Sequence, residues 1–272
     1  MNSKQLELDQ LLFQVGQVGK RLSDIGAAEG SAGNLSVCFR EPLNVAGYFP
    51  EVQRIELPVP APDLAGAMLI VSGSGRRLRE IIEAPTANLA CIVVEPGGHG
   101  GKMLTSPDRQ FERVTIEFNT HLAVHHDQMR SKGIKLHTIL HAQPLYLTYL
   151  SHLAAYQNEE YLNRHLLRWQ PETLYNFPEG IGILPFLLPG SAPLTAETVL
   201  ALRKHRMLIW SQHGVIVRVD KSISHALDLV EYAETAAHYE YLNLSAGERS
   251  QGLSPENLRE ISKAWNIRQN IF

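Results

Sequence analysis

Short apolar runs of strand type alternate with segments of helical periodicity along the whole chain. The pattern indicates strands in the runs Leu35–Phe39, Ala67–Val71, Leu89–Val94, Lys135–Leu140, Ile181–Leu184, Met207–Trp210 and Val215–Val217. It indicates helices at Gln5–Ile25, Thr115–Lys132, Pro144–Ala154, Ala196–Arg206 and Ile223–Leu244. Such alternation predicts an α/β fold in which helices cover both faces of one sheet. Several connections are too short for helical crossovers, so we expect a mixed sheet.

No break in composition divides the 272 residues, so we expect one domain over residues 1–272. The stretch from Pro50 to Leu64 holds three closely spaced prolines and is typical of a loop. The helix from Thr115 is expected to have Thr115 as its N-cap, Glu117 in its first turn and Gly133 as its stop.

Charge and cysteine content exclude several classes of protein. The formal net charge is −3 and the Lys and Arg residues are scattered, which argues against nucleic-acid or anionic-membrane partners. No apolar stretch reaches the length of about 18 residues that a membrane span needs, and the N-terminus lacks a leader pattern. The two cysteines, Cys38 and Cys91, lie in strand-like runs, which excludes a disulfide scaffold. We therefore expect a soluble, cytoplasmic protein.

Two of the twelve histidines stand in a context that suggests chemistry. His141 and His213 each occupy a strand end, where the backbone is rigid and the side chain can face a cleft. The histidines of the predicted helices, among them His121, His125 and His126, are better explained by structural or surface roles.

Two glycine-rich segments lie beside predicted strands, Glu29–Ser36 and Val71–Arg77. Such loops can direct backbone N–H groups and hydroxyls at a phosphate, and Arg76 or Arg77 could add positive charge. Neither segment matches the P-loop or the dinucleotide fingerprint, and each taken singly is also compatible with a plain tight turn. Together they indicate a small anionic ligand.

Six short motifs occur in the order and at nearly the spacing found in one enzyme family. They are Gly33–Ser36, Val71–Gly75, Thr115–Glu117, Ile139–His141, Phe177–Pro185 and Gln212–Val215. Through them almost the whole chain resembles the class II aldolase/adducin family. The segment Phe177–Pro185, followed by Leu188–Gly190, is similar to the rhamnulose-1-phosphate aldolase branch. The resemblance implies a three-layer α/β/α domain around a mixed, mainly antiparallel sheet.

The resemblance also implies one divalent metal ion per subunit, usually zinc, held by three histidines beside an acid/base glutamate. His141 and His213 match two of those histidines, and Glu117 matches the glutamate. Gln143 stands in the third position, so the expected His-x-His pair is His141-Ala-Gln143 here. An amide oxygen is a weaker zinc donor than imidazole, so metal affinity should fall. Gln143 then ligates the metal through its oxygen, orients a water or substrate, or marks a site that has lost its metal.

The phosphate site implied by the resemblance is partly altered as well. Asn34, Ser74 and Gly75 match phosphate contacts of the family. Ser31 replaces a usual asparagine, and Ile116 replaces a serine and has no donor to offer. Glu172 matches a glutamate that family members extend into a neighbouring subunit's site, which implies a homotetramer with sites between subunits.

The function implied by the resemblance is cleavage of L-rhamnulose 1-phosphate to dihydroxyacetone phosphate and L-lactaldehyde, in rhamnose metabolism. Two alternatives stay open. The chain could catalyse another reaction on a related sugar phosphate, such as epimerisation or dehydration, with Gln143 and Ile116 marking the change. It could instead be a non-catalytic, adducin-like module, which would have no evident need for Glu117.

Overall fold

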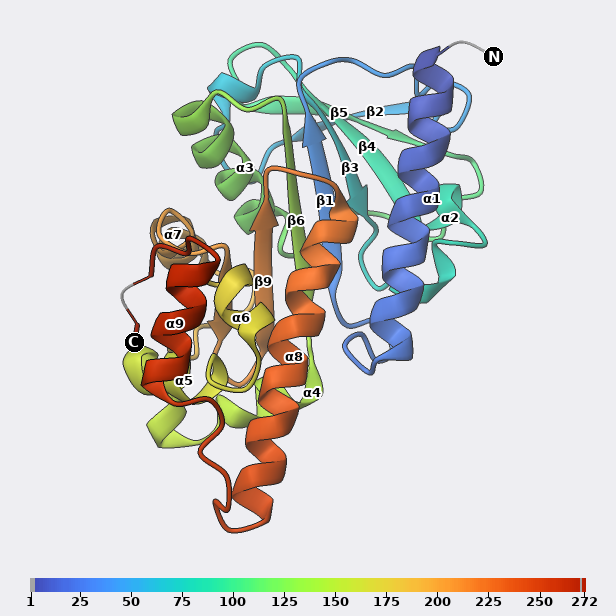
Figure 1. The fold of residues 1–272 in the computed structure, drawn as a ribbon. Coiled ribbons are helices and arrows are strands. Elements are labelled where there is room, and N and C mark those ends of the chain that lie inside the picture. The colour runs from blue at the N-terminus through green and yellow to red at the C-terminus, as the bar shows by residue number, and fades with distance from the viewer. Residues whose placement is uncertain (1–2, 270) are drawn as a thin grey trace.

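A nine-stranded sheet organises the chain in the computed structural model, which describes residues 3–269 and 271–272 (Figure 1). The strands are β1 Asn34–Phe39, β2 Glu51–Glu56, β3 Met68–Ser72, β4 Leu89–Val94, β5 Gly100–Thr105, β6 Leu136–Ala142, β7 Gly182–Leu184, β8 Met207–Trp210 and β9 Gly214–Val219. Their order is β2-β5-β4-β3-β1-β6-β9-β8-β7. All neighbouring pairs are antiparallel except β7 with β8, so the sheet is mixed and mainly antiparallel, as predicted.

Helices cover both faces of this sheet, which confirms the predicted α/β architecture (Figure 1). Helices α1 and α8 lie on one face and α3 and α7 on the other. The α-helices are α1 Ser3–Asp24, α2 Pro85–Asn88, α3 Phe118–Lys132, α4 Leu145–Leu150, α5 Glu159–Leu166, α6 Pro171–Asn176, α7 Ala192–Ala201, α8 Ile223–Ser245 and α9 Pro255–Ala264. Three short 3₁₀ turns, Pro62–Leu64, Leu78–Glu80 and Ala154–Gln157, complete the described part of the chain.

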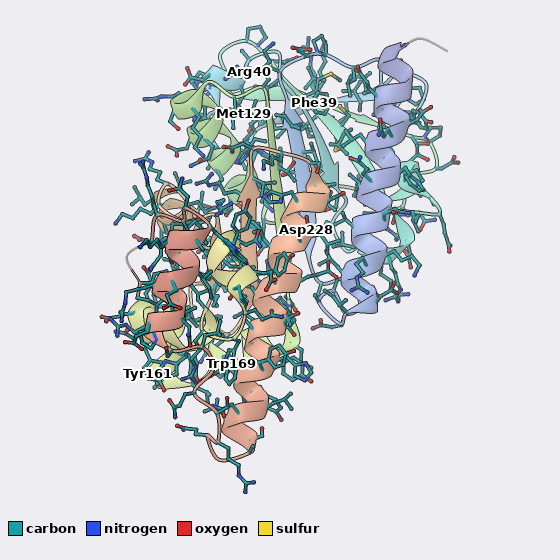
Figure 2. The ribbon with its side chains drawn as sticks, in the orientation of Figure 1. Phe39, Arg40, Met129, Tyr161, Trp169 and Asp228 are labelled. Carbon is teal, nitrogen blue, oxygen red and sulfur yellow. The ribbon has the colours of Figure 1, made fainter. Side chains whose placement is uncertain are left out.

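The two faces have separate apolar cores because side chains alternate along each strand. In β1, Leu35, Val37 and Phe39 pack with α1 and α8, whereas Cys38 packs with α3. Phe39 and Met129 mark these two cores (Figure 2). Within the described residues, no helix is long and apolar enough to cross a membrane.

Two strands were missed by the sequence patterns. The segment Pro50–Leu64 is not all loop, because β2 occupies Glu51–Glu56 and pairs with β5. Strand β2 is the edge strand and most of its side chains are exposed, so it lacks the apolar alternation on which the prediction relied. Strand β5 begins with Gly100 and Gly101, residues that depress strand signals.

Several predicted helix starts were wrong. Thr115 is not the N-cap of α3, because its N–H donates to the carbonyl of Ser72 and residues 116–117 form a turn before the helix begins at Phe118. Glu117 is the N-cap instead, immediately before the first turn, while Gly133 ends the helix as predicted. Pro144 caps α4 rather than starting it, and α7 lies at Ala192–Ala201, several residues before the predicted range. Helices α2, α5, α6 and α9 were not predicted.

Three buried histidines lie between α3 and the sheet. His121, His125 and His137 are fully buried. Burial lowers the pKa of His121 to about 3 and that of His137 to about 3, and it lowers the pKa of His125 as well. All three rings are therefore neutral in the folded protein at neutral pH, whereas in the unfolded chain they take up protons near pH 6.5.

We predict that these rings make the protein sensitive to mild acid. Between pH 7 and pH 5 the unfolded chain gains protons that the folded protein does not, so stability falls as pH falls. Replacing His137 with Gln removes one such group, and the loss over this range should shrink by about 2 kcal/mol. Urea unfolding at both pH values measures it. The same replacement at His152, an exposed residue, should leave the loss of unfolding free energy between pH 7 and pH 5 as in the wild type. An equal loss in all three proteins would contradict the prediction.

Candidate active site

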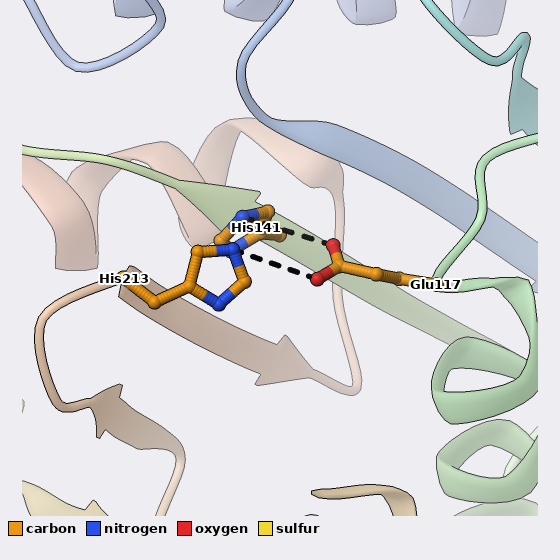
Figure 3. A group of neighbouring side chains, drawn as sticks. All are labelled: Glu117, His141 and His213. Carbon is orange, nitrogen blue, oxygen red and sulfur yellow. Dashed lines mark ion pairs between the residues drawn. The ribbon is translucent and has the colours of Figure 1, made fainter. Parts of the chain in front are cut away.

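Three side chains from distant parts of the chain meet at one point (Figure 3). Glu117 comes from the start of α3, His141 from β6 and His213 from the turn before β9. His141 Nε2 lies 3.7 Å from Oε2 of Glu117, and His213 Nε2 lies 3.6 Å from its Oε1. The carboxylate therefore faces both rings.

His141 is held in one orientation by the centre of the sheet. It pairs with Asn34 of β1 on one side and with Ile216 of β9 on the other. Its Nδ1 lies 2.8 Å from the carbonyl oxygen of Val215, which can only accept, so Nδ1 carries the proton. The lone pair is thereby left on Nε2, the atom that faces Glu117.

The position of His213 depends on an unusual turn. Gln212 has a φ of 63°, a conformation that residues with a side chain seldom adopt, and its N–H donates to Ser151 Oγ. A Cβ atom on Gly214 would lie 2.5 Å from the carbonyl oxygen of Ala142, so only glycine fits there. The ring of Trp210 stacks on His213 at 5.3 Å between centroids and also packs against His141.

Glu117 is buried but charged. Burial by itself disfavours the carboxylate, yet His141, a hydrogen bond from Asn34 and His213 together hold the pKa of Glu117 below its usual value. Asn34 Nδ2 donates to Oε2 at 2.8 Å, and Thr115 Oγ1 accepts from the N–H of Glu117. Burial lowers the pKa of His213 to about 4, so its ring is neutral at physiological pH.

The three side chains fit a divalent cation. Two atoms that each lie about 2.1 Å from one tetrahedral ion are about 3.4 Å apart, close to the two nitrogen–oxygen distances here. Oε1 of Glu117, which faces Nε2 of His213, is buried without a hydrogen-bond partner. Among the described residues, this is the one group of three or more histidine, cysteine or acidic side chains whose ligand atoms lie within 4.8 Å of one another. Two imidazoles and a carboxylate are a recognised ligand set for zinc.

A pocket of about 240 Å³ opens above these side chains. Its wall contains all the residues predicted for the site except Glu172, namely Ser31, Asn34, Ser74, Gly75, Glu117, His141, Gln143 and His213. Glu172 lies in the first turn of α6, exposed, and does not line the pocket of its own chain. Ile116 lies at the rim with 57% of its surface exposed.

The suggestion that Arg76 or Arg77 reaches the same ligand was wrong for the pocket of this chain. Arg76 donates to Asn88 and to Glu80, and both arginines line a different hollow. The described lining of the active-site pocket contains no lysine or arginine. An anion there would meet hydroxyls and amides instead of a charged side chain.

Sequence reasoning missed several residues of the site. Thr115 and Pro189 line the pocket, and Trp210 packs against both histidines. Thr115 and Pro189 belong to motifs that were recognised, Thr115–Glu117 and Leu188–Gly190, but no role was given to them. Trp210 ends a predicted strand three residues before His213, and this proximity could have indicated it.

Comparison with known proteins gives consistent matches. A family model described as the class II aldolase and adducin N-terminal domain matches residues 14–241. A rhamnulose-1-phosphate aldolase from Yersinia pestis (strain Pestoides F) is 28% identical over 225 residues, covering 81% of this chain and 79% of the relative. A crystal structure of a sugar-phosphate aldolase from Thermotoga maritima is 28% identical with a TM-score of 0.74, covering 90% of this chain and 100% of the other.

A more distant structure shares the fold alone. The L-fuculose-1-phosphate aldolase from Thermus thermophilus is 18% identical with a TM-score of 0.58, covering 89% of this chain and 98% of the other. Since the family model matches most of the chain, the protein belongs to the class II aldolase and adducin family and is an enzyme of the aldolase type, a lyase.

Proposed function

We propose that the protein is a metal-dependent aldolase that cleaves L-rhamnulose 1-phosphate to dihydroxyacetone phosphate and L-lactaldehyde. The convergence of Glu117, His141 and His213 at the floor of one pocket carries the proposal. The relative from Yersinia pestis named rhamnulose-1-phosphate aldolase supports the choice of substrate, and the sugar-phosphate aldolase from Thermotoga maritima supports the substrate class.

The reaction breaks a carbon–carbon bond next to a ketone and leaves negative charge on an enediolate. A divalent ion, which we expect to be Zn²⁺, would act as a Lewis acid that stabilises this charge. His141 and His213 would each present a ring nitrogen to it, and Glu117 would complete the set. Because the pKa of Glu117 is lowered, its carboxylate is ready to accept the hydroxyl proton as the bond breaks and to return it to the enediolate carbon.

The phosphate would lie at the end of the pocket lined by Ser31, Ser74 and Gly75. Asn34 adds an amide next to this end and is already bonded to Glu117. Neutral donors in a concave wall can hold a phosphate without a charged side chain. Anchoring the phosphate would fix the position of the bond that breaks relative to Glu117.

Gln143 lines the pocket next to His141 and leads toward α4, and its backbone N–H donates to the carbonyl of Ala27 at 2.8 Å. In this proposal its side-chain oxygen ligates the ion or orients a water or substrate beside it. An oxygen donor in place of imidazole weakens the binding of zinc and is a better ligand for harder ions.

The proposal includes the assembly and the compartment expected from the sequence. We propose a homotetramer in which Glu172, exposed on α6, reaches the pocket of a neighbouring subunit. Residues 1–272 are proposed to act as one domain, and the two free, buried cysteines fit a reducing, cytoplasmic setting.

One alternative function has an observation in its favour. Gln143 and the exposed Ile116 both line the pocket, and each departs from the family pattern, so a related sugar phosphate or an epimerase or dehydratase reaction is the second candidate. Product analysis separates the two, because an epimerase returns a sugar phosphate of unchanged mass. A non-catalytic module is disfavoured by the buried, charged Glu117 between two imidazoles.

We predict that replacing Glu117 with Gln lowers kcat for cleavage of L-rhamnulose 1-phosphate by at least about 100-fold, the usual contribution of a general acid or base. The assay couples dihydroxyacetone phosphate to its reduction, and circular dichroism checks that the fold is intact. The wild-type arm includes metal analysis. The aldolase proposal would be wrong if the wild-type protein neither binds nor is activated by a divalent ion and cleaves no ketose 1-phosphate. Full activity of Glu117→Gln would contradict only the role given to Glu117.

We predict that replacing Gln143 with His tightens zinc binding by about tenfold or more, because imidazole is the better donor. Competition against a zinc-binding dye measures the dissociation constant. The same replacement at Gln170, a glutamine outside the pocket, provides the control and should leave the constant unchanged. An unchanged constant for the Gln143 variant would mean that this side chain points away from the ion.

A further inference from the structure

Helix α3 meets the sheet along a line of polar side chains that begins at the active site. On the helix these residues recur every fourth position, and on β1 and β6 they recur at positions that face the same side of the sheet. The line starts with Glu117, Asn34 and His141 at the pocket. It continues into the interior as a group that we call the polar seam, made of Ser36, His121, His125 and His137.

The polar seam is a continuous chain of hydrogen bonds. Ser36 Oγ lies 2.7 Å from Nδ1 of His121 and 2.7 Å from Nε2 of His125. His125 Nδ1 lies 2.7 Å from Nδ1 of His137, and His137 Nε2 lies 3.9 Å from the carboxylate of Asp220. The four members of the seam are fully buried. The chain of hydrogen bonds therefore runs from behind Glu117 to His137, whose Nε2 is buried without a hydrogen-bond partner.

The rise per residue along α3 and along the strands lets the contacts of the seam form in only one register of α3 against the sheet. Four helical residues advance about 6 Å and two strand residues advance about 6.6 Å, so successive contacts stay aligned. Asn34 meets Glu117, and two residues further along β1 Ser36 meets His121, four residues further along α3. A shift or rotation of α3 by one residue would break both contacts at once.

Proton counting shows that the hydrogen bonds of the seam can all be made with its three rings neutral. Each neutral ring carries one N–H, and Ser36 carries one O–H. If His137 directs its Nε2–H toward Asp220, its Nδ1 accepts from His125, His125 Nε2 accepts from Ser36, and Ser36 Oγ accepts from His121 Nδ1–H. Every bond is then made by one donor and one acceptor without any charge. The reverse arrangement pairs every donor with an acceptor as well, because His121 Nε2 and His137 Nε2, at the two ends of the chain, have no hydrogen-bond partner.

Apolar packing alone could have filled this space. The flanking positions of α3, Phe118, Leu122 and Met129, belong to an ordinary apolar core. Buried polar groups cost free energy unless they are fully paired, and their bonds have directions that apolar contacts lack. The interface between α3 and the sheet could be stable through apolar packing alone. The polar seam adds hydrogen bonds that fix the orientation of α3 on the sheet.

We propose that Ser36, through the polar seam, is a positioning residue that fixes the first turn of α3 and thereby aims Glu117 at His141 and His213. This role rests on the proposed function, in which Glu117 is both a metal ligand and the acid/base group. Ser36 is the centre of the seam because its one hydroxyl joins two rings.

The test compares Ser36→Ala with a matched change on another side of α3. Thr120 is also fully buried on α3, and its hydroxyl bonds Thr195 at 2.7 Å, so Thr120→Val removes a buried hydrogen bond and leaves the seam intact. Ser36→Thr keeps the hydroxyl and serves as the rescue variant. Urea unfolding of each protein shows how much stability each change removes.

Three quantities are measured on the full-length variants: the zinc dissociation constant, kcat and KM for L-rhamnulose 1-phosphate, and hydrogen exchange of the His121 amide, which donates to the carbonyl of Glu117. We expect Ser36→Ala to weaken zinc binding about tenfold or more, because the start of α3, and with it the ligand Glu117, would no longer be held in one position. It should also lower kcat more than it changes KM and speed exchange at His121. Thr120→Val and Ser36→Thr should stay near wild type in all three.

Equal zinc affinity and equal His121 exchange in Ser36→Ala and Thr120→Val would overturn the positioning role, since the seam would then be ordinary packing. A wild-type protein that binds no zinc would count against the proposed function instead. Hydrogen exchange in the metal-free protein would still decide whether Ser36 fixes the start of α3.

Discussion

The pairing of β6 with β1 on one side and β9 on the other is the constraint on which the site depends. It sets Asn34, His141 and Ile216 in one row across the middle of the sheet. The row carries His141 directly and brings Asn34 within reach of Glu117. The turn that holds His213 leads straight into β9, so the same strand pairing sets its distance from His141. The same strand pairing therefore determines both the stability of the central strands and the geometry of the site.

Much of the fold was predictable because its buried strands have strong local patterns. Strands β4 and β8 were predicted at their observed bounds, since each is a compact run buried on both faces. Strand β2 was not predicted, because an exposed edge strand has no apolar alternation to detect. The start of α3 was misplaced because Thr115 bonds to Ser72, a contact between distant segments that no local pattern contains.

The sequence predicted which residues form the site better than it predicted the contacts that hold them in place. Local context singled out His141 and His213, but only likeness to a family connected them with Glu117. The support beneath these residues was beyond sequence reasoning. His121 and His125 were assigned structural or surface roles, and nothing in the helix pattern indicated that both meet Ser36 of a strand about 85 residues away. Trp210 and the turn at Gln212 likewise acquire their meaning only in three dimensions.

The two ends of the sheet bear on how copies of the protein can associate. Strand β2, at one end, carries Glu51, Arg54 and Glu56 on its exposed surface, and β7, at the other, has only three residues. Charged or very short border strands discourage pairing with a strand from another molecule. The two edges of the sheet therefore disfavour pairing with a strand of another copy, which favours helices and loops as contact surfaces. Those are also the surfaces that surround the mouth of the pocket.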